Sequence, residues 1–165
     1  MLEINEQNFE SISGMELILF LERVHTGDSW GRFLKIVSIL ETSTKRAIGI
    51  KLGLDPANKY LGKQEFMNTV HLCAELNIIS NEARQFVIKL IEIRNKLVHT
   101  TGQLILDIQE LQGEKFYKNY IKQTDNYVRV SNAKIDNGDS DHFIILITGC
   151  THFINQISES LYPSN

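Results

Sequence analysis

The chain has 165 residues, of which 42% are apolar and 22% are charged, and this composition is typical of one domain with a substantial core. Its formal net charge of −3 argues against a broad basic surface, so nucleic acid would have to bind a local patch of lysine and arginine. No apolar run approaches the ~18 residues that a membrane helix needs. The first residues also lack the basic and apolar regions of a secretion signal. We therefore expect a cytoplasmic protein that does not enter a membrane.

The two cysteines, Cys73 and Cys150, both lie in apolar segments with helical spacing. Buried thiols in a chain without a secretion signal fit a reducing compartment, and we expect them to be small core residues. Cys150 and His152 are two positions apart, which on a helix places them about 200° from each other. They are therefore not expected to bind one metal ion together. We expect no metal site and no cofactor.

Apolar residues recur at helical spacing through the first half of the chain, where a single proline interrupts them. The first predicted helix covers roughly 5–25, with Gly14 as a weak point. After the break "HTGDS", the second predicted helix covers roughly 29–53, and Asp28 or Ser29 is expected to cap it. Asp-Pro then predicts a loop over 54–62, and a third helix follows over 63–77.

The fourth predicted helix covers roughly 81–100, with Ser80 or Asn81 as its cap, and it contains the most informative stretch of the sequence. Helical spacing continues over 104–123, with an interruption at Gly113. The polar segment 126–141 then predicts a long loop with room for a short hairpin. A last helix, 142–161, is expected to begin after Ser140 or Asp141.

Together these segments predict an all-α antiparallel bundle of five or six helices that forms a single domain over 1–165. The connections at 26–28 and 77–80 are short. Helices joined by such short connections are expected to lie antiparallel.

Arg94 is the residue that the helical pattern does not explain. At 100° per residue it falls at the centre of the apolar arc of the fourth helix, close to Val87 and Leu90. A guanidinium cannot lose its charge in a protein, so its burial is costly unless it is paired or faces a wet groove. His99 lies about 140° from Arg94 on an ideal helix. The two side chains could therefore share a cleft only from adjacent walls.

Three explanations for Arg94 remain open from the residues alone. It could form a buried ion pair with a carboxylate of a neighbouring helix, such as Glu75 or Asp107. It could lie in a groove between two protomers. It could also bind a phosphate while His99 transfers a proton.

The segment "IRNKLVH", residues 93–99, resembles the Arg-x4-His motif of the HEPN superfamily, a group of small all-α proteins found in toxin–antitoxin and other defence systems. The stretches "FMNTVHLCAELNIIS" and "IKLIEIRNKLVH" are also similar to the middle of mannitol-operon-repressor-like members. The resemblance covers 30–102, and 103–165 is compatible with a helical extension.

This resemblance implies a helical bundle that forms a homodimer, with two copies of the motif facing one cleft. Active members of the superfamily are metal-independent endoribonucleases. By this resemblance Arg94 would hold the scissile phosphate, and His99 would transfer protons during attack by the RNA 2′-OH. Asn95 would orient the phosphate or the histidine. RNA would be the substrate, and an antitoxin or another regulatory protein would be a partner.

The chain departs from the pattern of the superfamily at two points. Some members carry a tyrosine two residues after the histidine, where a partner nucleotidyltransferase modifies them, but here that position is Thr101. Some members use an acidic residue from elsewhere in the bundle, for which the sequence shows no counterpart. Not all proteins with this motif are nucleases. The alternative function is therefore a non-catalytic regulator that works through protein–protein contacts.

A group of basic residues lies in the predicted helix 104–123. Its lysines share one side of the helix, and aromatic residues alternate with them, which is a pattern that could contact RNA. The expected explanation is a solvated face. The lysines and aromatic residues are Lys115, Lys118, Lys122, Phe116, Tyr117 and Tyr120.

Overall fold

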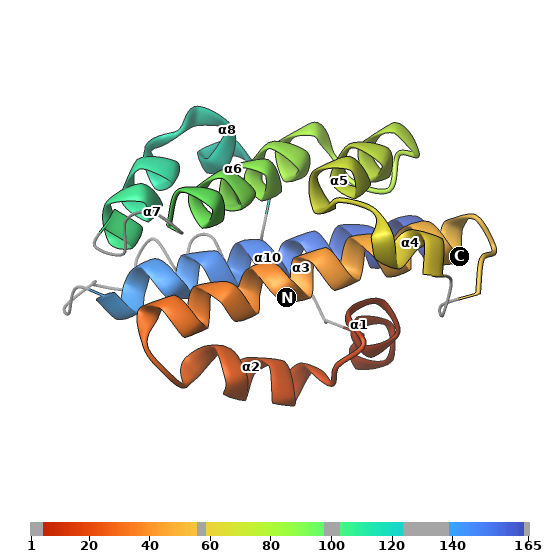
Figure 1. Ribbon diagram of the computed structural model, residues 1–165, viewed down its shortest axis with the longest axis horizontal. Coiled ribbons are helices and arrows are strands. Elements are labelled where there is room, and N and C mark those ends of the chain that lie inside the picture. Colours follow the sequence, from red (N-terminus) through yellow and green to blue (C-terminus); the bar gives the residue numbers. More distant parts are fainter. Residues whose placement is uncertain (1–4, 56–58, 98–102, 124–138, 164–165) are drawn as a thin grey trace.

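The computed structural model describes residues 5–55, 59–97, 103–123 and 139–163, with only the backbone described for 139–142. These residues form helices and no strand, so the prediction of an all-α fold is confirmed for them. The helices are α1 (Glu6–Ser13), α2 (Leu17–His25), α3 (Ser29–Lys51), α4 (Lys59–Lys63), α5 (Phe66–Glu75), α6 (Asn81–Leu97), α7 (Leu104–Gly113), α8 (Lys115–Lys122) and α10 (Asp139–Leu161), as Figure 1 shows.

The two longest helices, α3 and α10, form the centre of the fold and pack along each other in the same direction (Figure 1). Arg32 in the first turn of α3 lies 4.2 Å from the centre of the ring of Phe143, near the start of α10. Helices α1 and α2 cover one side of this pair, and α5, α6, α7 and α8 cover the other (Figure 1). Within the described residues, no helix is both long and apolar enough to cross a membrane.

One cluster of buried side chains receives members from every described helix, from Phe9 in α1 to Phe153 in α10. Its largest members are aromatic, and burial of such rings contributes much of the stability of a small domain. The aromatic residues that are almost fully buried are Phe9, Phe20, Phe33, Phe86, Tyr120, Phe143 and Phe153.

Two of the predicted helix caps are confirmed. The carboxylate of Asp28 accepts a hydrogen bond of 2.7 Å from the backbone N–H of Gly31 at the start of α3. The hydroxyl of Ser80 accepts one of 3.2 Å from the N–H of Ala83 at the start of α6. These side chains satisfy N–H groups that have no partner within the helix, so they define where both helices begin.

The described residues contain more helices than the five or six predicted, because two predicted helices are divided and a short one, α4, forms in the predicted loop 54–62. Gly14 ends α1 with a φ of 74°, a conformation that glycine adopts without strain, and its N–H donates to the carbonyl of Glu10. The hydroxyl of Ser13 then donates to the carbonyl of Met15 and accepts from its N–H, which fixes the turn into α2.

The second division separates α7 from α8 at Glu114, next to the predicted interruption at Gly113. The last helix begins at Asp139, three residues earlier than predicted. The hairpin proposed within 126–141 lies largely outside the described residues.

The bundle is not antiparallel throughout. Helices α2 and α3 run antiparallel, as predicted from their short connection (Figure 1). Phe66 at the start of α5 lies near Arg94 toward the end of α6, so these two helices also run antiparallel. The central helices α3 and α10 run parallel because the long segment 52–138 joins them, and a long connection does not force a reversal of direction.

Gly149 in α10 lies directly against the ring of Phe86 in α6. A Cβ atom at this position would lie 2.8 Å from Cζ of Phe86, and the hydroxyl of Tyr120 donates to the Gly149 carbonyl at 2.7 Å. We expect Gly149→Ala to lower the free energy of unfolding by about 1–2 kcal/mol, because overpacking outweighs the better helix propensity of alanine. Urea denaturation measures this change.

The control is Gly113→Ala, because a Cβ atom at Gly113 meets no other atom within 4 Å. This variant is expected to retain the stability of the wild type. An equal loss of stability in the two variants would contradict the close approach at Gly149.

Candidate functional site

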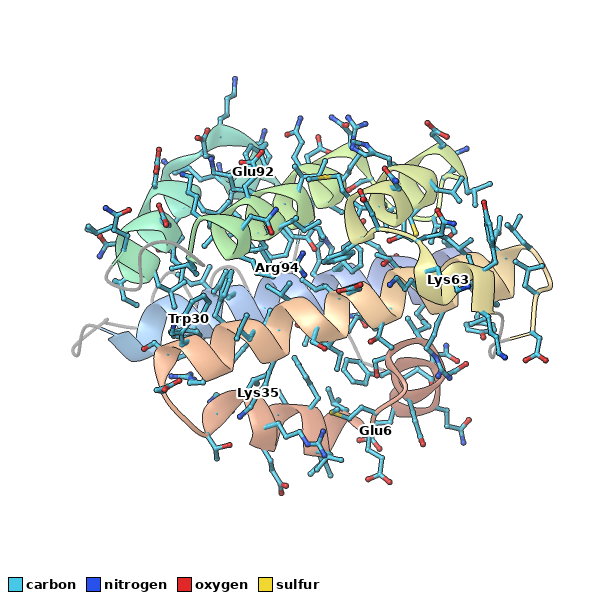
Figure 2. All side chains as sticks on the ribbon, viewed as in Figure 1. Glu6, Trp30, Lys35, Lys63, Glu92 and Arg94 are labelled. Atoms are coloured by element: carbon cyan, nitrogen blue, oxygen red, sulfur yellow. The ribbon has the colours of Figure 1, made fainter. Side chains whose placement is uncertain are left out.

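Arg94 lies on the side of α6 that faces the bundle, as predicted, but it is not sealed in the core. Its neighbours along the same face, Val87 and Leu90, are fully buried, whereas the side chain of Arg94 retains 33% of its exposure. The guanidinium extends from α6 toward α3 (Figure 2). There Nη1 lies 3.6 Å from Oε2 of Glu41. This distance describes an ion pair rather than a short hydrogen bond.

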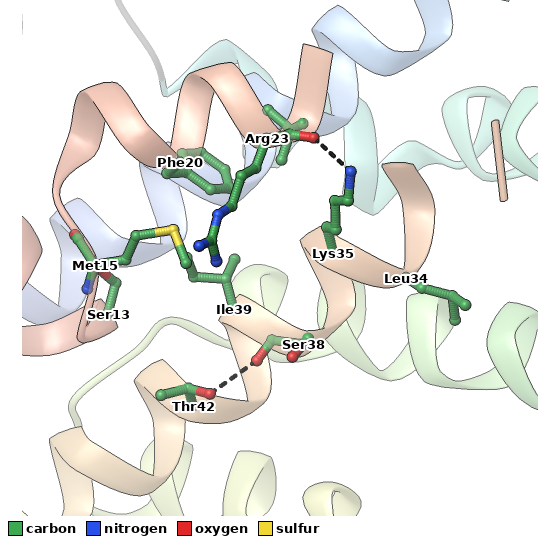
Figure 3. Close-up of a pocket in the computed structure, with 10 residues that line it drawn as sticks. Ser13, Met15, Phe20, Arg23, Leu34, Lys35, Ser38, Ile39 and Thr42 are labelled. Atoms are coloured by element: carbon green, nitrogen blue, oxygen red, sulfur yellow. Dashed lines mark hydrogen bonds between the residues drawn. The ribbon is translucent and has the colours of Figure 1, made fainter. Parts of the chain in front are cut away.

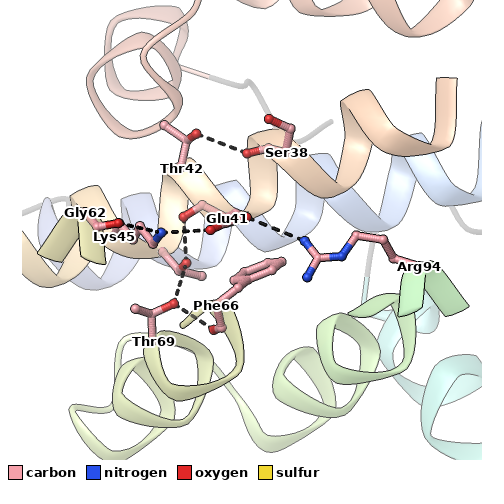
Figure 4. A network of polar contacts seen from close by, with 9 residues as sticks. Ser38, Glu41, Thr42, Lys45, Gly62, Phe66, Thr69 and Arg94 are labelled. Carbon is pink, nitrogen blue, oxygen red and sulfur yellow. Dashed lines mark hydrogen bonds and ion pairs between the residues drawn. The ribbon is translucent and has the colours of Figure 1, made fainter. Parts of the chain in front are cut away.

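Glu41 is shared between two cations. Its Oε1 atom accepts a hydrogen bond of 2.8 Å from Nζ of Lys45, one turn further along α3, while Oε2 faces Arg94 (Figure 4). Lys45 also reaches the carbonyl of Gly62 in α4, at 3.5 Å. One carboxylate between two cations neutralises only one of them. This group of three side chains, which we call the Glu41 cluster, therefore has one positive charge left over.

The Glu41 cluster lies beside an apolar wall. The ring of Phe66 is buried, and its centre lies 6.0 Å from Cζ of Arg94, at the outer limit of a cation–π contact. The hydroxyls of Thr44 and Thr69 lie 3.3 Å apart and link α3 to α5.

The carboxylate partner of Arg94 is neither of the two residues considered from the sequence. Asp107 is buried and pairs instead with Lys96, whose Nζ lies 4.0 Å from Oδ1. Glu75 is at the far end of α5 from Phe66, the residue of that helix near Arg94. The bridging carboxylate comes from the middle of α3 because that part of the long helix packs across the end of α6.

Sequence reasoning did not single out Glu41. The one sequence signal at this position is its spacing of four residues from Lys45, which forms the observed pair. Such pairs are common on exposed helix faces and carry little information about a site. The contact between Glu41 and Arg94 depends on how two distant helices pack, and one helical pattern does not contain that information.

The other two residues of the predicted motif are not joined to Arg94 by the described contacts. Asn95 is exposed and lies about 100° around α6 from Arg94, away from the Glu41 cluster. His99 and Thr101 lie outside the described residues. The distance between Arg94 and His99, and a cleft shared by two protomers, therefore stay predictions.

Two of the three aromatic residues in the basic region of α8 are core residues and do not present their rings to a ligand such as RNA. Tyr117 and Tyr120 are 3% and 0% exposed and belong to the core, and burial raises the pKa of both hydroxyls. Phe116 is half-buried and packs against the same core. The lysines of this helix are exposed, so they form the solvated face that was expected; they are Lys115, Lys118 and Lys122.

The described part of the chain contains no group of three or more histidine, cysteine or acidic side chains that could hold a metal ion. Cys73 and Cys150 are buried free thiols, in agreement with the prediction. Burial raises the pKa of Cys73 to about 12 and also raises that of Cys150. Neither thiol is therefore suited to act as a nucleophile at neutral pH.

In comparisons with known proteins, the chain matches no protein-family model, no curated protein and no solved structure. The Glu41 cluster can attract and hold an anion, because it combines an uncompensated positive charge, a half-exposed guanidinium and an apolar wall.

Proposed function

We propose that this chain is a HEPN-like RNA-binding protein that acts, as a cytoplasmic homodimer, as a metal-independent endoribonuclease of a toxin–antitoxin or defence system. Arg94 would hold the scissile phosphate, His99 would transfer protons, and Asn95 would orient the phosphate or the histidine. An antitoxin or another regulatory protein would be its partner. The proposal rests on the motif in the sequence and on one observation, the position of Arg94 in the Glu41 cluster.

The Glu41 cluster supports phosphate binding for electrostatic reasons. A partly exposed ion pair at 3.6 Å contributes little free energy, so a phosphate can compete with Glu41 for the guanidinium at a small cost. Lys45 remains nearby and compensates the carboxylate when Arg94 turns to the phosphate. An arginine can contact two phosphate oxygens at once, and this geometry also suits the more highly charged transition state of cleavage.

A cleavage assay with a structured RNA in EDTA tests this function. We expect the wild type to cleave and Arg94→Ala and His99→Ala to show no more cleavage than a sample without protein, because phosphate binding and proton transfer are lost. His25→Ala is the matched control, since His25 is an exposed histidine at the end of α2, and it should cleave as the wild type does. Equal cleavage by the wild type and His99→Ala would remove the enzymatic proposal.

The alternative function is a non-catalytic regulator that works through protein–protein contacts. It is favoured by exposed apolar side chains around α2, since Ile18, Leu19 and Leu34 are 63%, 37% and 43% exposed. Under this alternative, Arg94 only joins α6 to α3 through Glu41. Expression of the protein distinguishes the two functions, because toxicity that Arg94→Ala relieves supports the nuclease.

A further inference from the structure

A second site lies on the other side of α3, in a pocket of about 300 Å³ between α2 and α3. Its floor is formed by Phe20, Val24 and Ile39, which are at most 6% exposed. Met15 contributes a flexible apolar wall (Figure 3). The volume is at the lower end of the range for sites that bind small organic molecules, and an apolar lining with a few polar groups is typical of them.

One charged group enters this pocket without a partner. The guanidinium of Arg23 extends from α2 over the floor, toward Met15 and Ile39 (Figure 3). Among the described residues, none forms a side-chain ion pair or hydrogen bond with it. Lys35 also borders the pocket, but its ammonium group donates to the carbonyls of Arg23 and Thr26, at 3.0 Å each, and so completes the end of α2.

The charges around the pocket favour a ligand with a single negative charge. Arg23 presents its guanidinium to the pocket, whereas Lys35 keeps its positive charge but directs N–H groups at two backbone carbonyls. Glu10, Glu16 and Glu22 border an adjacent hollow that Arg23 also lines. Their carboxylates would repel a doubly charged group such as a phosphate monoester. Ser38 of α3 also lines the pocket, on its exposed side (Figure 3).

We propose that this pocket binds a small amphipathic monocarboxylate, with its carboxylate on Arg23 and its hydrocarbon part on Phe20, Val24 and Ile39. The planar guanidinium presents two parallel N–H groups to the two oxygens of a carboxylate. The buried floor offers the hydrocarbon a place out of water. This site is separate from the Glu41 cluster, so it does not depend on the proposed nuclease function.

Isothermal titration calorimetry with sodium octanoate tests the proposal on the full chain. We expect a dissociation constant below about 1 mM for the wild type. Arg23→Gln should weaken binding at least about tenfold, because a charge-assisted contact is lost. Lys51→Gln is the control, since it removes one exposed positive charge at the far end of α3, and it should bind octanoate as the wild type does.

Two further arms separate the proposed site from general hydrophobic adsorption. Octylammonium should not bind, because Arg23 repels it, and 1-octanol should bind weakly and equally to the wild type and Arg23→Gln. Ser38→Phe, at an exposed position, should fill the mouth and abolish octanoate binding while thermal unfolding stays unchanged. The proposal is overturned if the folded wild type does not bind octanoate, or if Arg23→Gln binds it as tightly as the wild type.

Discussion

Acidification from pH 7 to pH 4 is expected to lower the free energy of unfolding by roughly 3 kcal/mol through a single side chain, His152. This histidine is 9% exposed, and burial lowers its pKa to about 4. In the unfolded chain, His152 binds a proton with the ordinary histidine pKa of about 6.5. In the folded chain, it binds a proton only at a lower pH. The stability that comes from the neutral His152 ring is therefore fully present above about pH 6.5. It is lost progressively as the pH is lowered from there to about pH 4.

The hydrogen bonds around His152 explain why the neutral ring is preferred. Oε1 of Gln156 accepts from the N–H and the hydroxyl of Ser80, both at 3.2 Å, so the amide turns its NH2 group toward the ring. That NH2 lies 3.2 Å from Nε2 of His152, which must accept. The ring proton is thereby assigned to Nδ1, and a second proton on Nε2 would face another donor. The ring of Tyr120, with its centre 4.8 Å away, further excludes water.

Urea denaturation at a series of pH values measures this effect as a difference between variants. The wild type should lose roughly 3 kcal/mol more than His152→Gln between pH 7 and pH 4, because glutamine does not titrate. His25→Gln replaces an exposed histidine and should follow the wild type. Identical pH dependence in the wild type and His152→Gln would show that His152 titrates normally in the folded protein.

Phe86→Ala is expected to lower the free energy of unfolding by about 3–5 kcal/mol. Phe86 of α6 is fully buried between α8 and Gly149 of α10. The centre of its ring lies 5.0 Å from that of Tyr120 and 5.8 Å from that of Tyr117, and it fills the space beside Gly149. Removal of the ring loses hydrophobic transfer free energy, leaves a cavity and removes two aromatic contacts.

Thermal and urea unfolding measure the loss, and Leu106→Ala provides the control because this apolar side chain in α7 is 63% exposed. Its stability should change by no more than about 0.5 kcal/mol. Phe86→Leu retains much of the volume and should lie between Phe86→Ala and the wild type. A loss below about 1 kcal/mol for Phe86→Ala would contradict the packing of α6 against α8 and α10.

The long helices could be predicted from the sequence because their periodicity and caps agree. The second predicted helix, 29–53, corresponds closely to α3, and the predicted start of the fourth at 81 agrees with α6. The break after Ser13 was harder to predict, since a glycine is tolerated within a helix and its left-handed φ depends on how the flanking helices pack. The parallel arrangement of α3 and α10 likewise has no local signal.

The candidate site could be predicted only in part, for a similar reason. The position of Arg94 on the inner face of α6 follows from helical geometry. Its half-exposure and its pairing with Glu41 depend on the crossing of two helices that are far apart in the chain. Its ion pair with Glu41 was thus the least predictable part of the site.

The parallel pairing of α3 with α10 also constrains how the chain acquires its fold during synthesis. Helix α3 leaves the ribosome long before α10, yet much of its apolar surface, including Phe33, belongs to the core that α10 completes. Until the last helix emerges, that surface has no permanent cover. Nascent chains that stop before residue 139 should therefore associate with chaperones or aggregate, and the final helix should convert them into a cooperatively folded molecule.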